Sequence, residues 1–451
     1  MYNLKDTAIP WIGSIPEEWN VEKVKQHFFL KKAKAQQDNP VILSLARSGI
    51  KIRDISSNEG QIAESYFNYN PVKPGDLLLN PMDLVSGANC NVSKVTGVIS
   101  PAYSNLRSKG YADPEYYNYF FKWQYIIMAL FAHGKGVSSD NRWTLNNNEL
   151  LNYFIPVPTR DEQKQIVRFL DWKISGVNRL ISSKQREIAL IRERKLAEID
   201  RAVTRGVHNT ALKESGLNWL PLIPEGWETI PAKALFSHET ELRHEGDEML
   251  AATQKYGMIP QKEYMEREGR RIVLATDNLD KWLHVEPDEF IISLRSFQGG
   301  LELCTIEGCV TWHYVVLRPK ENVYVPYFKW LFKSPSYIGA LQRTSDFIRD
   351  GQDLRFSNFV KVRLPLIPIQ EQRTIADYLE RVVPQFDEVE KELLHEIDLL
   401  KELRDKIIEE VVTGRIDVRN IVIPEYKYEE EDTDDDSDIE PDNDETEEQE
   451  D

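Results

Sequence analysis

The residues that could perform chemistry are few, and none of them completes a catalytic motif. Asn80-Pro-Met-Asp83 partly matches the Asn-Pro-Pro-aromatic motif of adenine methyltransferases, but it lacks the second proline and the aromatic ring that stacks on a flipped base. Gly134-Lys-Gly-Val-Ser-Ser lacks the glycine and lysine spacing of a phosphate-binding loop. Pro287-Asp288 could begin a nuclease carboxylate site, but Glu302-Leu-Cys304 lacks the lysine that would complete it.

The spacing of the histidines and cysteines does not indicate a metal site or a reactive thiol either. The 8 histidines show no HExxH or other metal-ligand pattern, and His313 beside Trp312 is interpreted as a packed sheet residue. The three cysteines Cys90, Cys304 and Cys309 form neither a CxxC pair nor a disulfide framework, and buried free thiols are expected. The sequence therefore predicts a binding protein with no catalytic, metal or cofactor site of its own.

The elements that would position binding residues are clearest between Pro368 and Gly414. Apolar residues recur there at steps of three and four, with charged residues in the gaps. Steps that average about 3.5 residues keep one stripe on one side of a helix, as in a coiled coil. Pro384 lacks an N–H, so it predicts a kink or a short helix followed by a long one, and Gly414 predicts the helix end.

A similar segment occurs 209 residues earlier, followed by a less regular helical stripe that Gly176 interrupts. The pairs that match at this offset are Leu145 and Leu354, Pro156 and Pro365, Glu162-Gln163 and Glu371-Gln372, Ile166 and Ile375, and Leu170 and Leu379. Upstream, Trp11–Trp19 matches Trp219–Trp227, and Ala202-Val-Thr-Arg-Gly206 matches Val411-Val-Thr-Gly-Arg415. A period this long does not fit a solenoid and predicts a duplicated unit of globular domain and helix.

The duplication divides the chain into five segments of an α+β protein. We predict a first mixed α/β domain at 1–160, a helical arm at 161–208, a second domain at 209–369, a second arm at 370–418 and an acidic tail at 419–451. The aromatic-rich helix at 114–132, which the segment 326–341 repeats, is predicted to belong to the core rather than to stack on bases.

The net charge of −18 is concentrated at the C-terminus. From Glu425 to Asp451 there are 17 acidic residues and one lysine, whereas residues 1–208 have 28 basic and 21 acidic residues. The tail repels itself and has little to bury, so it is predicted to be disordered, either as solubilising ballast or as a mimic of phosphate. No apolar stretch of about 18 residues exists, and the N-terminus lacks a signal-peptide core, which favours a cytoplasmic protein.

Taken together, these motifs carry a family resemblance. Both domains end in Pro-x-x-x-x-x-Glu-Gln-x-x-Ile, at Pro156–Ile166 and Pro365–Ile375, and each is followed by a long helix that closes on a Thr-Gly-like signal. With the repeated Ile-Pro-x-x-Trp segment, the chain resembles the specificity subunit of prokaryotic type I restriction-modification systems over about residues 8–420. It departs from the family in the ending Thr204-Arg-Gly206 and in the acidic tail.

The resemblance implies a non-catalytic DNA adaptor. In that family the two globular domains are target-recognition domains, and each reads half of a split double-stranded DNA sequence. The two helices pair as an antiparallel coiled coil with a pseudo-two-fold axis and dock two adenine-N6 methyltransferase subunits, and restriction nuclease/translocase subunits join for cleavage. S-adenosylmethionine, ATP and Mg²⁺ are expected in those partners. An unbroken arm of about 44 residues would span about 65 Å. If the arm is broken, its longer piece of about 28 residues would span about 42 Å.

Candidate residues follow from the way proteins read DNA, with lysine and arginine on phosphates and side chains on base edges. For DNA contact we select Lys31, Lys32, Lys34, Arg47, Lys51, Arg53, Ser138, Ser139, Asn141 and Arg142 in the first domain, and Lys255, Arg270, Arg271, Arg295, Gln298, Arg349, Gln352 and Arg355 in the second. For the coiled coil and subunit contacts we select Ile166, Leu170, Ile181, Ile188, Ile375, Leu379, Phe386, Val389, Leu393, Ile397 and Leu400. Because residues 209–369 hold 19 basic and 22 acidic residues, partner subunits are expected to supply much of the phosphate neutralisation.

Two other classes of function remain open at this point. The chain could be an interaction scaffold or an anti-restriction decoy that uses its acidic tail as a phosphate mimic, or it could be a free-standing enzyme. Deleting the tail would separate the decoy from the adaptor, and turnover by the chain alone would indicate the enzyme.

Overall fold

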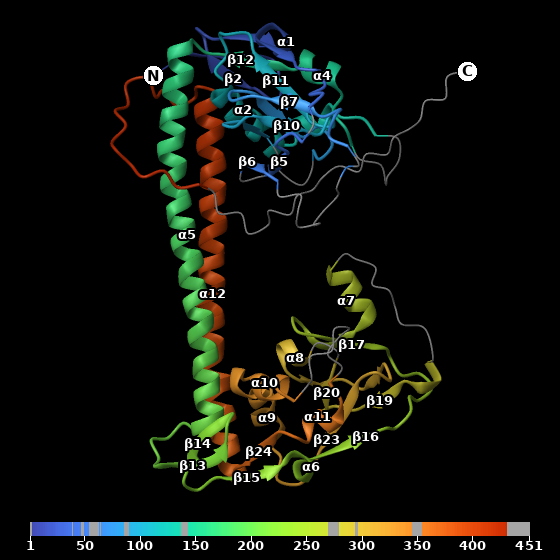
Figure 1. The fold of residues 1–451 in the computed structure, drawn as a ribbon. Helices are drawn as coiled ribbons and strands as arrows, with labels where there is room; N and C mark the ends of the chain where they lie inside the picture. The colour runs from blue at the N-terminus through green and yellow to red at the C-terminus, as the bar shows by residue number, and fades with distance from the viewer. Residues whose placement is uncertain are drawn as a thin grey trace, which may run out of the picture. The chain divides into compact units, whose positions relative to one another are not determined.

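The computed structural model describes residues 2–430 except 38, 47–48, 54–62, 64, 85–89, 137–142, 269–278, 294–295 and 345–353. The chain forms two compact units, with unit 1 made of 1–185 and 394–451 and unit 2 made of 186–393. Each unit therefore contains a globular domain and part of each long helix (Figure 1). None of the described helices is long and apolar enough to cross a membrane.

Unit 1 is a set of short antiparallel sheets with one aromatic helix against them. Its strands are β1 (Leu4–Asp6), β2 (Ser14–Pro16), β3 (Asn20–Lys23), β4 (Phe28–Leu30), β5 (Leu43–Ala46), β6 (Gly49–Ile52), β7 (Asn70–Val72), β8 (Leu77–Leu79), β9 (Cys90–Val92), β10 (Gly97–Ile99), β11 (Ser104–Ser108) and β12 (Phe154–Val157). Its short helices are α1 (Val24–His27), α2 (Pro114–Ile126), α3 (Ala129–Ala132) and α4 (Asn147–Asn152). The largest sheet has the order β4-β11-β8-β9.

Unit 2 is built in the same way from different sequence. Its strands are β13 (Leu212–Leu217), β14 (Leu220–Pro224), β15 (Glu228–Pro231), β16 (Phe236–Glu239), β17 (Leu250–Thr253), β18 (Gly257–Pro260), β19 (Leu283–Val285), β20 (Phe290–Ile292), β21 (Glu302–Leu303), β22 (Gly308–Val310), β23 (Val315–Pro319) and β24 (Arg363–Leu366). Its short helices are α6 (Ala232–Leu235), α7 (Gln261–Glu268), the 3-10 turn Leu279–Lys281, α8 (Ser296–Gly299), α9 (Val325–Leu331), α10 (Pro335–Gln342) and α11 (Phe356–Phe359).

The strand pairing of unit 2 follows that of unit 1 sheet by sheet. The order β16-β23-β20-β21 repeats β4-β11-β8-β9, and the pairs β13-β14, β15-β24, β17-β18 and β19-β22 repeat β1-β2, β3-β12, β5-β6 and β7-β10. All of these ladders are antiparallel. The α+β class that the sequence predicts is therefore confirmed.

The two long helices are α5 (Arg160–Arg205) and α12 (Ile369–Val412), and both are continuous. Neither helix is divided into a short and a long piece at Gly176 or Pro384. Both residues are exposed, so the carbonyl that Pro384 leaves without its N–H partner is on the side where water can bind it. Exposure therefore explains why α12 tolerates a proline that would disrupt a buried turn.

Within each unit the two helices lie side by side and run in opposite directions (Figure 1). In unit 2, Lys195 binds Asp387 and Arg192 binds Glu390, each at 2.7 Å. Residue numbers therefore increase along α5 in the direction in which they decrease along α12, as in an antiparallel pair. In unit 1, Lys184 pairs with Glu396, and the Ile166 end of α5 shares a core with the Val412 end of α12. Surface pairs of this kind contribute little, and the shared cores hold the helices.

The predicted apolar stripe is mostly buried but shifts along α12. The seam residues Ile166, Leu170, Ile181, Ile188, Ile375, Leu379, Leu393 and Ile397 are at most 7% exposed. Phe386 and Leu400 are half-buried and Val389 is 39% exposed. Val383 and Ile408 are buried, whereas their neighbours Val382 and Ile407, which would continue a 3.5-residue ladder, are only half-buried. A straight helix turns every 3.6 residues and therefore drifts from such a ladder.

Each domain holds the start of one long helix and the end of the other through equivalent contacts. In unit 1, Gln163 at the start of α5 accepts the N–H of Asp113, the N-cap of α2, at 2.7 Å, and Tyr116 donates to the carbonyl of Val412 at the end of α12 at 2.8 Å. In unit 2, Gln372 accepts the N–H of Tyr324 at 2.8 Å, and Tyr327 donates to Val203 at 2.8 Å.

The glycines that follow the helices complete these junctions. Gly414 has φ +72 and lies against Trp19 and Pro16, and Gly206 has φ +75 and lies near Trp227. A left-handed residue after a helix favours glycine, because other side chains are strained there. Gly206 therefore ends its helix as Gly414 does, despite the extra Arg205.

The C-terminal segment after α12 is partly ordered. Gln165 on α5 donates to the carbonyls of Val418 and Ile421, and Ser175 donates to that of Lys427 at 3.0 Å. Side-chain donors on α5 thus hold the backbone of this segment, which acidic composition alone does not reveal. The disorder expected from residue 419 does not apply to 419–430, and residues 431–451 lie outside the described residues.

Candidate nucleic-acid interface

Lys31, the first candidate DNA contact, is used inside unit 1. Its side chain is 15% exposed, and its Nζ lies 3.6 Å from the buried carboxylate of Asp76, which also accepts from Arg107 Nε at 2.5 Å. Burial lowers the pKa of Lys31, although the Asp76 charge opposes the shift. Its position beside a buried carboxylate gives Lys31 a structural role in unit 1, and its selection as a phosphate contact stays a prediction.

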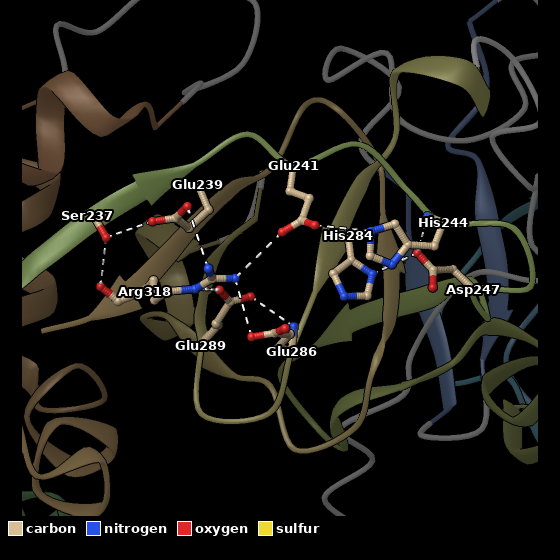
Figure 2. Close-up of polar contacts among 9 residues, drawn as sticks. All are labelled: Ser237, Glu239, Glu241, His244, Asp247, His284, Glu286, Glu289 and Arg318. Atoms are coloured by element: carbon tan, nitrogen blue, oxygen red, sulfur yellow. Dashed lines mark hydrogen bonds and ion pairs between the residues drawn. The ribbon is translucent and has the colours of Figure 1, made fainter.

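Unit 2 repeats this arrangement with more acid. Arg318 on β23 donates to the buried carboxylate of Glu289 at 2.7 Å, as Arg107 on β11 does to Asp76. Three further glutamates, Glu239, Glu241 and Glu286, lie within 4.0 Å of the same guanidinium (Figure 2). Four carboxylates around one arginine give this face a net negative charge, which disfavours contact with phosphate.

The other described candidates are at the surface. Lys32, Lys34, Lys51 and Arg355 are exposed and Arg53 is half-buried. Lys255 is exposed but binds Glu268 at 3.0 Å and lies 4.8 Å above the ring of Tyr256. These residues stay candidates, because an exposed cation keeps its charge available to phosphate whether or not it has a neighbour.

The candidates outside the described residues are Arg47, Ser138, Ser139, Asn141, Arg142, Arg270, Arg271, Arg295, Arg349 and Gln352. Gln298 is on α8, but its side chain is also outside them. Their roles therefore stay predictions.

Asn80 and Glu302, from two of the incomplete catalytic motifs, make contacts that serve the fold. Asn80 is buried and accepts the N–H groups of Met82 and Asp83, so it shapes a turn. Glu302 is paired with Lys333. The three cysteines are buried and free, as the sequence predicts, and burial raises the pKa of Cys304 and Cys309 to about 11.

Two aromatic predictions have opposite outcomes. The aromatic helix α2 is a core element, as expected, with Tyr116, Tyr117 and Phe120 fully buried. His313 lies in the turn between β22 and β23 rather than in a sheet. It is exposed there and stacks on Trp312, with 3.6 Å between the ring centroids. Trp312 is 43% exposed in the turn between β22 and β23, a position that its sequence context did not indicate.

Each unit also exposes large apolar side chains on its part of the long helices. In unit 1 Leu180, Leu394, Leu399 and Leu403 are 44–53% exposed. In unit 2 Leu190 and Leu196 on α5 are 64% and 43% exposed. Apolar side chains gathered on a helix that already has a partner are typical of surfaces that bind further helices.

Comparison with known proteins agrees on one group. No family model matches the chain. A Methanocaldococcus jannaschii chain assigned as the specificity subunit of type I restriction enzyme MjaX is 22% identical, over 92% of this chain and 97% of the relative. The Escherichia coli EcoBI specificity subunit is 22% identical over 81% of this chain and 79% of its own length.

Comparison of the fold with solved structures indicates the same group of proteins. A solved structure from work on the assembly and conformational transition of the type I R-M system superposes with a TM-score of 0.64 at 14% identity, covering 89% of this chain and 99% of that one. In fold, and in sequence along most of its length, the chain is thus like the specificity subunits of type I restriction enzymes.

Proposed function

We propose that the chain is the sequence-specific DNA-recognition subunit of a type I restriction-modification complex. Residues 1–160 and 209–369 are two target-recognition domains related by duplication, and each reads one half of a bipartite double-stranded DNA target. The observation that carries the proposal is the sheet-by-sheet repeat of the two units, each holding the start of one long helix and the end of the other.

The helical arms 161–208 and 370–418 act in this proposal as an antiparallel coiled coil that fixes the spacing of the half-sites. Opposite chain directions in both units support it, because antiparallel copies are related by a pseudo-two-fold axis. The exposed leucines on the helices supply docking surfaces for two adenine-N6 methyltransferase subunits, through which nuclease/translocase subunits join. The chain itself performs no catalysis and works in the prokaryotic cytoplasm, and S-adenosylmethionine, ATP and Mg²⁺ bind to its partners.

A second candidate is a decoy or scaffold whose acidic tail imitates DNA, favoured by the 17 acidic residues in 425–451. Deleting residues 431–451 separates the two functions and spares the segment that contacts α5. For the adaptor we expect the complex with its methyltransferase partner to methylate the same adenines with and without these residues. Because the deletion removes negative charge, binding to DNA should become tighter or stay the same.

The measurement is a map of methylated adenines in genomic DNA, made with the full chain and with the deletion. Loss of the methylation pattern on deletion would contradict the adaptor. Inhibition of a restriction enzyme by the full chain, and loss of that inhibition on deletion, would instead support the decoy.

A further inference from the structure

A group of metal-ligating side chains lies in unit 2. His244, Asp247 and His284 each offer a ligand atom, and these atoms lie within 4.8 Å of one another. Among the side chains that the structure describes, only this trio brings three such ligands together. Spacing in the sequence did not reveal it, because His284 is 37 residues from Asp247 and reaches it only through the fold.

The backbone around the trio is held in place before any ion binds. His244 and Asp247 belong to the segment between β16 and β17, and His284 is on β19. The segment runs along β19, where His284 N–H donates to the carbonyl of Glu241 at 2.9 Å and Arg243 N–H donates to that of Trp282 at 2.9 Å. Asp247 also closes a turn by accepting the N–H of His244 at 2.7 Å. Preorganised ligands of this kind bind metals without a large ordering cost.

One pair of ligand atoms in the trio is already close to the spacing that a zinc ion requires. His284 Nδ1 and Asp247 Oδ2 are 2.9 Å apart, whereas a tetrahedral zinc ion with bonds near 2.0 Å holds neighbouring ligand atoms about 3.3 Å apart. A shift of a few tenths of an ångström lets the ion replace the hydrogen between them, and the imidazole ring then carries its hydrogen on Nε2. The ring of His244 stacks on that of His284 at 4.0 Å between centroids (Figure 2).

The surroundings of the trio also favour a cation. His244 Nε2 lies 3.1 Å from Glu241 Oε1, the kind of histidine–carboxylate pairing that orients metal ligands in other proteins. His284 and Asp247 side chains are 3% and 6% exposed, while that of His244 is 52% exposed. The trio is thus closed on one side and open on the other, where the ion can enter and bind water. The four glutamates around Arg318 add net negative charge nearby.

We propose that His244, Asp247 and His284 form a binding site for a divalent transition-metal ion of the zinc type, with water in the fourth position and Glu241 orienting His244. The ion ties the segment between β16 and β17 to β19 and therefore has a structural role. Two imidazoles and one carboxylate select zinc-like ions over Mg²⁺ and Ca²⁺, which prefer all-oxygen ligands. The site does not depend on the proposed DNA-reading function.

The test is titration of the full chain with ZnCl₂ by calorimetry, using chain purified without a histidine tag and stripped with a chelator. Millimolar Mg²⁺ is kept present to occupy the carboxylates of the tail. We expect one strong zinc site per chain, and zinc should raise the thermal midpoint of the chain. Glu241→Gln should weaken binding about 10- to 100-fold, as loss of such supporting carboxylates does elsewhere.

The decisive variant is His244→Gln, because this side chain is largely exposed and its removal leaves the fold intact. It should abolish the strong site while the metal-free far-UV spectrum and thermal midpoint stay unchanged. The matched control His313→Gln, an exposed histidine in the same unit, should bind zinc as the unaltered chain does. Absence of a strong site in the unaltered chain, or equal binding by His244→Gln, would overturn the proposal.

Discussion

Replacing Gly414 by alanine is expected to destabilise unit 1 by about 3 kcal/mol. Two effects add. Gly414 has φ +72, where a residue with a Cβ is strained, and that Cβ would lie 2.6 Å from Pro16 Cγ and 2.8 Å from Trp19 Cη2. Neither neighbour can easily move, because Pro16 is on β2 and Trp19 is 1% exposed in the core. Calorimetry should show the midpoint of this unit fall by about 6–12 °C.

Two other glycines provide matched controls for Gly414→Ala. At Gly206 the same left-handed conformation faces looser neighbours, with Glu371 Oε1 at 3.3 Å and Trp227 Cζ2 at 3.6 Å, so alanine should cost only about 1–2 kcal/mol. Gly176 lies inside α5 with open space around it, so alanine there should stabilise by about 0.5–1 kcal/mol. Equal effects at Gly414 and Gly176 would contradict the junction described for unit 1.

Changing two exposed leucines of α12 to glutamine is expected to abolish binding of the methyltransferase partner. Leu399 and Leu403 are 49% and 50% exposed, and their four-residue spacing places them on the same face of the helix. If partner helices bury both side chains, Leu399→Gln with Leu403→Gln should cost at least about 3 kcal/mol of binding, which is more than about 100-fold in affinity. Because both are exposed in the chain alone, its own stability should change little.

Co-purification of the partner with the tagged chain measures the effect. Lys401→Gln is the control, since Lys401 is a similarly exposed residue between the two leucines and its side chain points to another side of the helix. Retention of the partner by the double variant would show that this face of α12 is not a docking surface.

The sequence revealed much of the fold because its duplicated motifs are the residues that hold the junctions. Gln163 and Gln372 match in the sequence and make equivalent hydrogen bonds to the N–H of the residue before an aromatic helix. Trp19 and Trp227 match and both lie next to a glycine that ends a long helix. Buried polar groups and left-handed glycines accept few substitutes, so they are readable even where the domains differ.

What the sequence could not reveal depends on solvent exposure and on long-range pairing. Pro384 indicated a break, but its exposed position lets α12 continue. The pairing of Lys31 with Asp76 could not be read from spacing, because the two residues are 45 positions apart in the chain. The trio of His244, Asp247 and His284 forms only when a loop runs along β19. Composition and spacing carry no information about such partners.

The central claim is that two domains each read half of one DNA target, and a chimera tests it most directly. Residues 209–369 are replaced by the corresponding segment of another specificity subunit, and methylated adenines are mapped for the complex with each chain. The account predicts a split sequence in which one half changes while the other half and the spacer length stay the same. A methylated sequence that is not split, or one whose two halves both change, would contradict it.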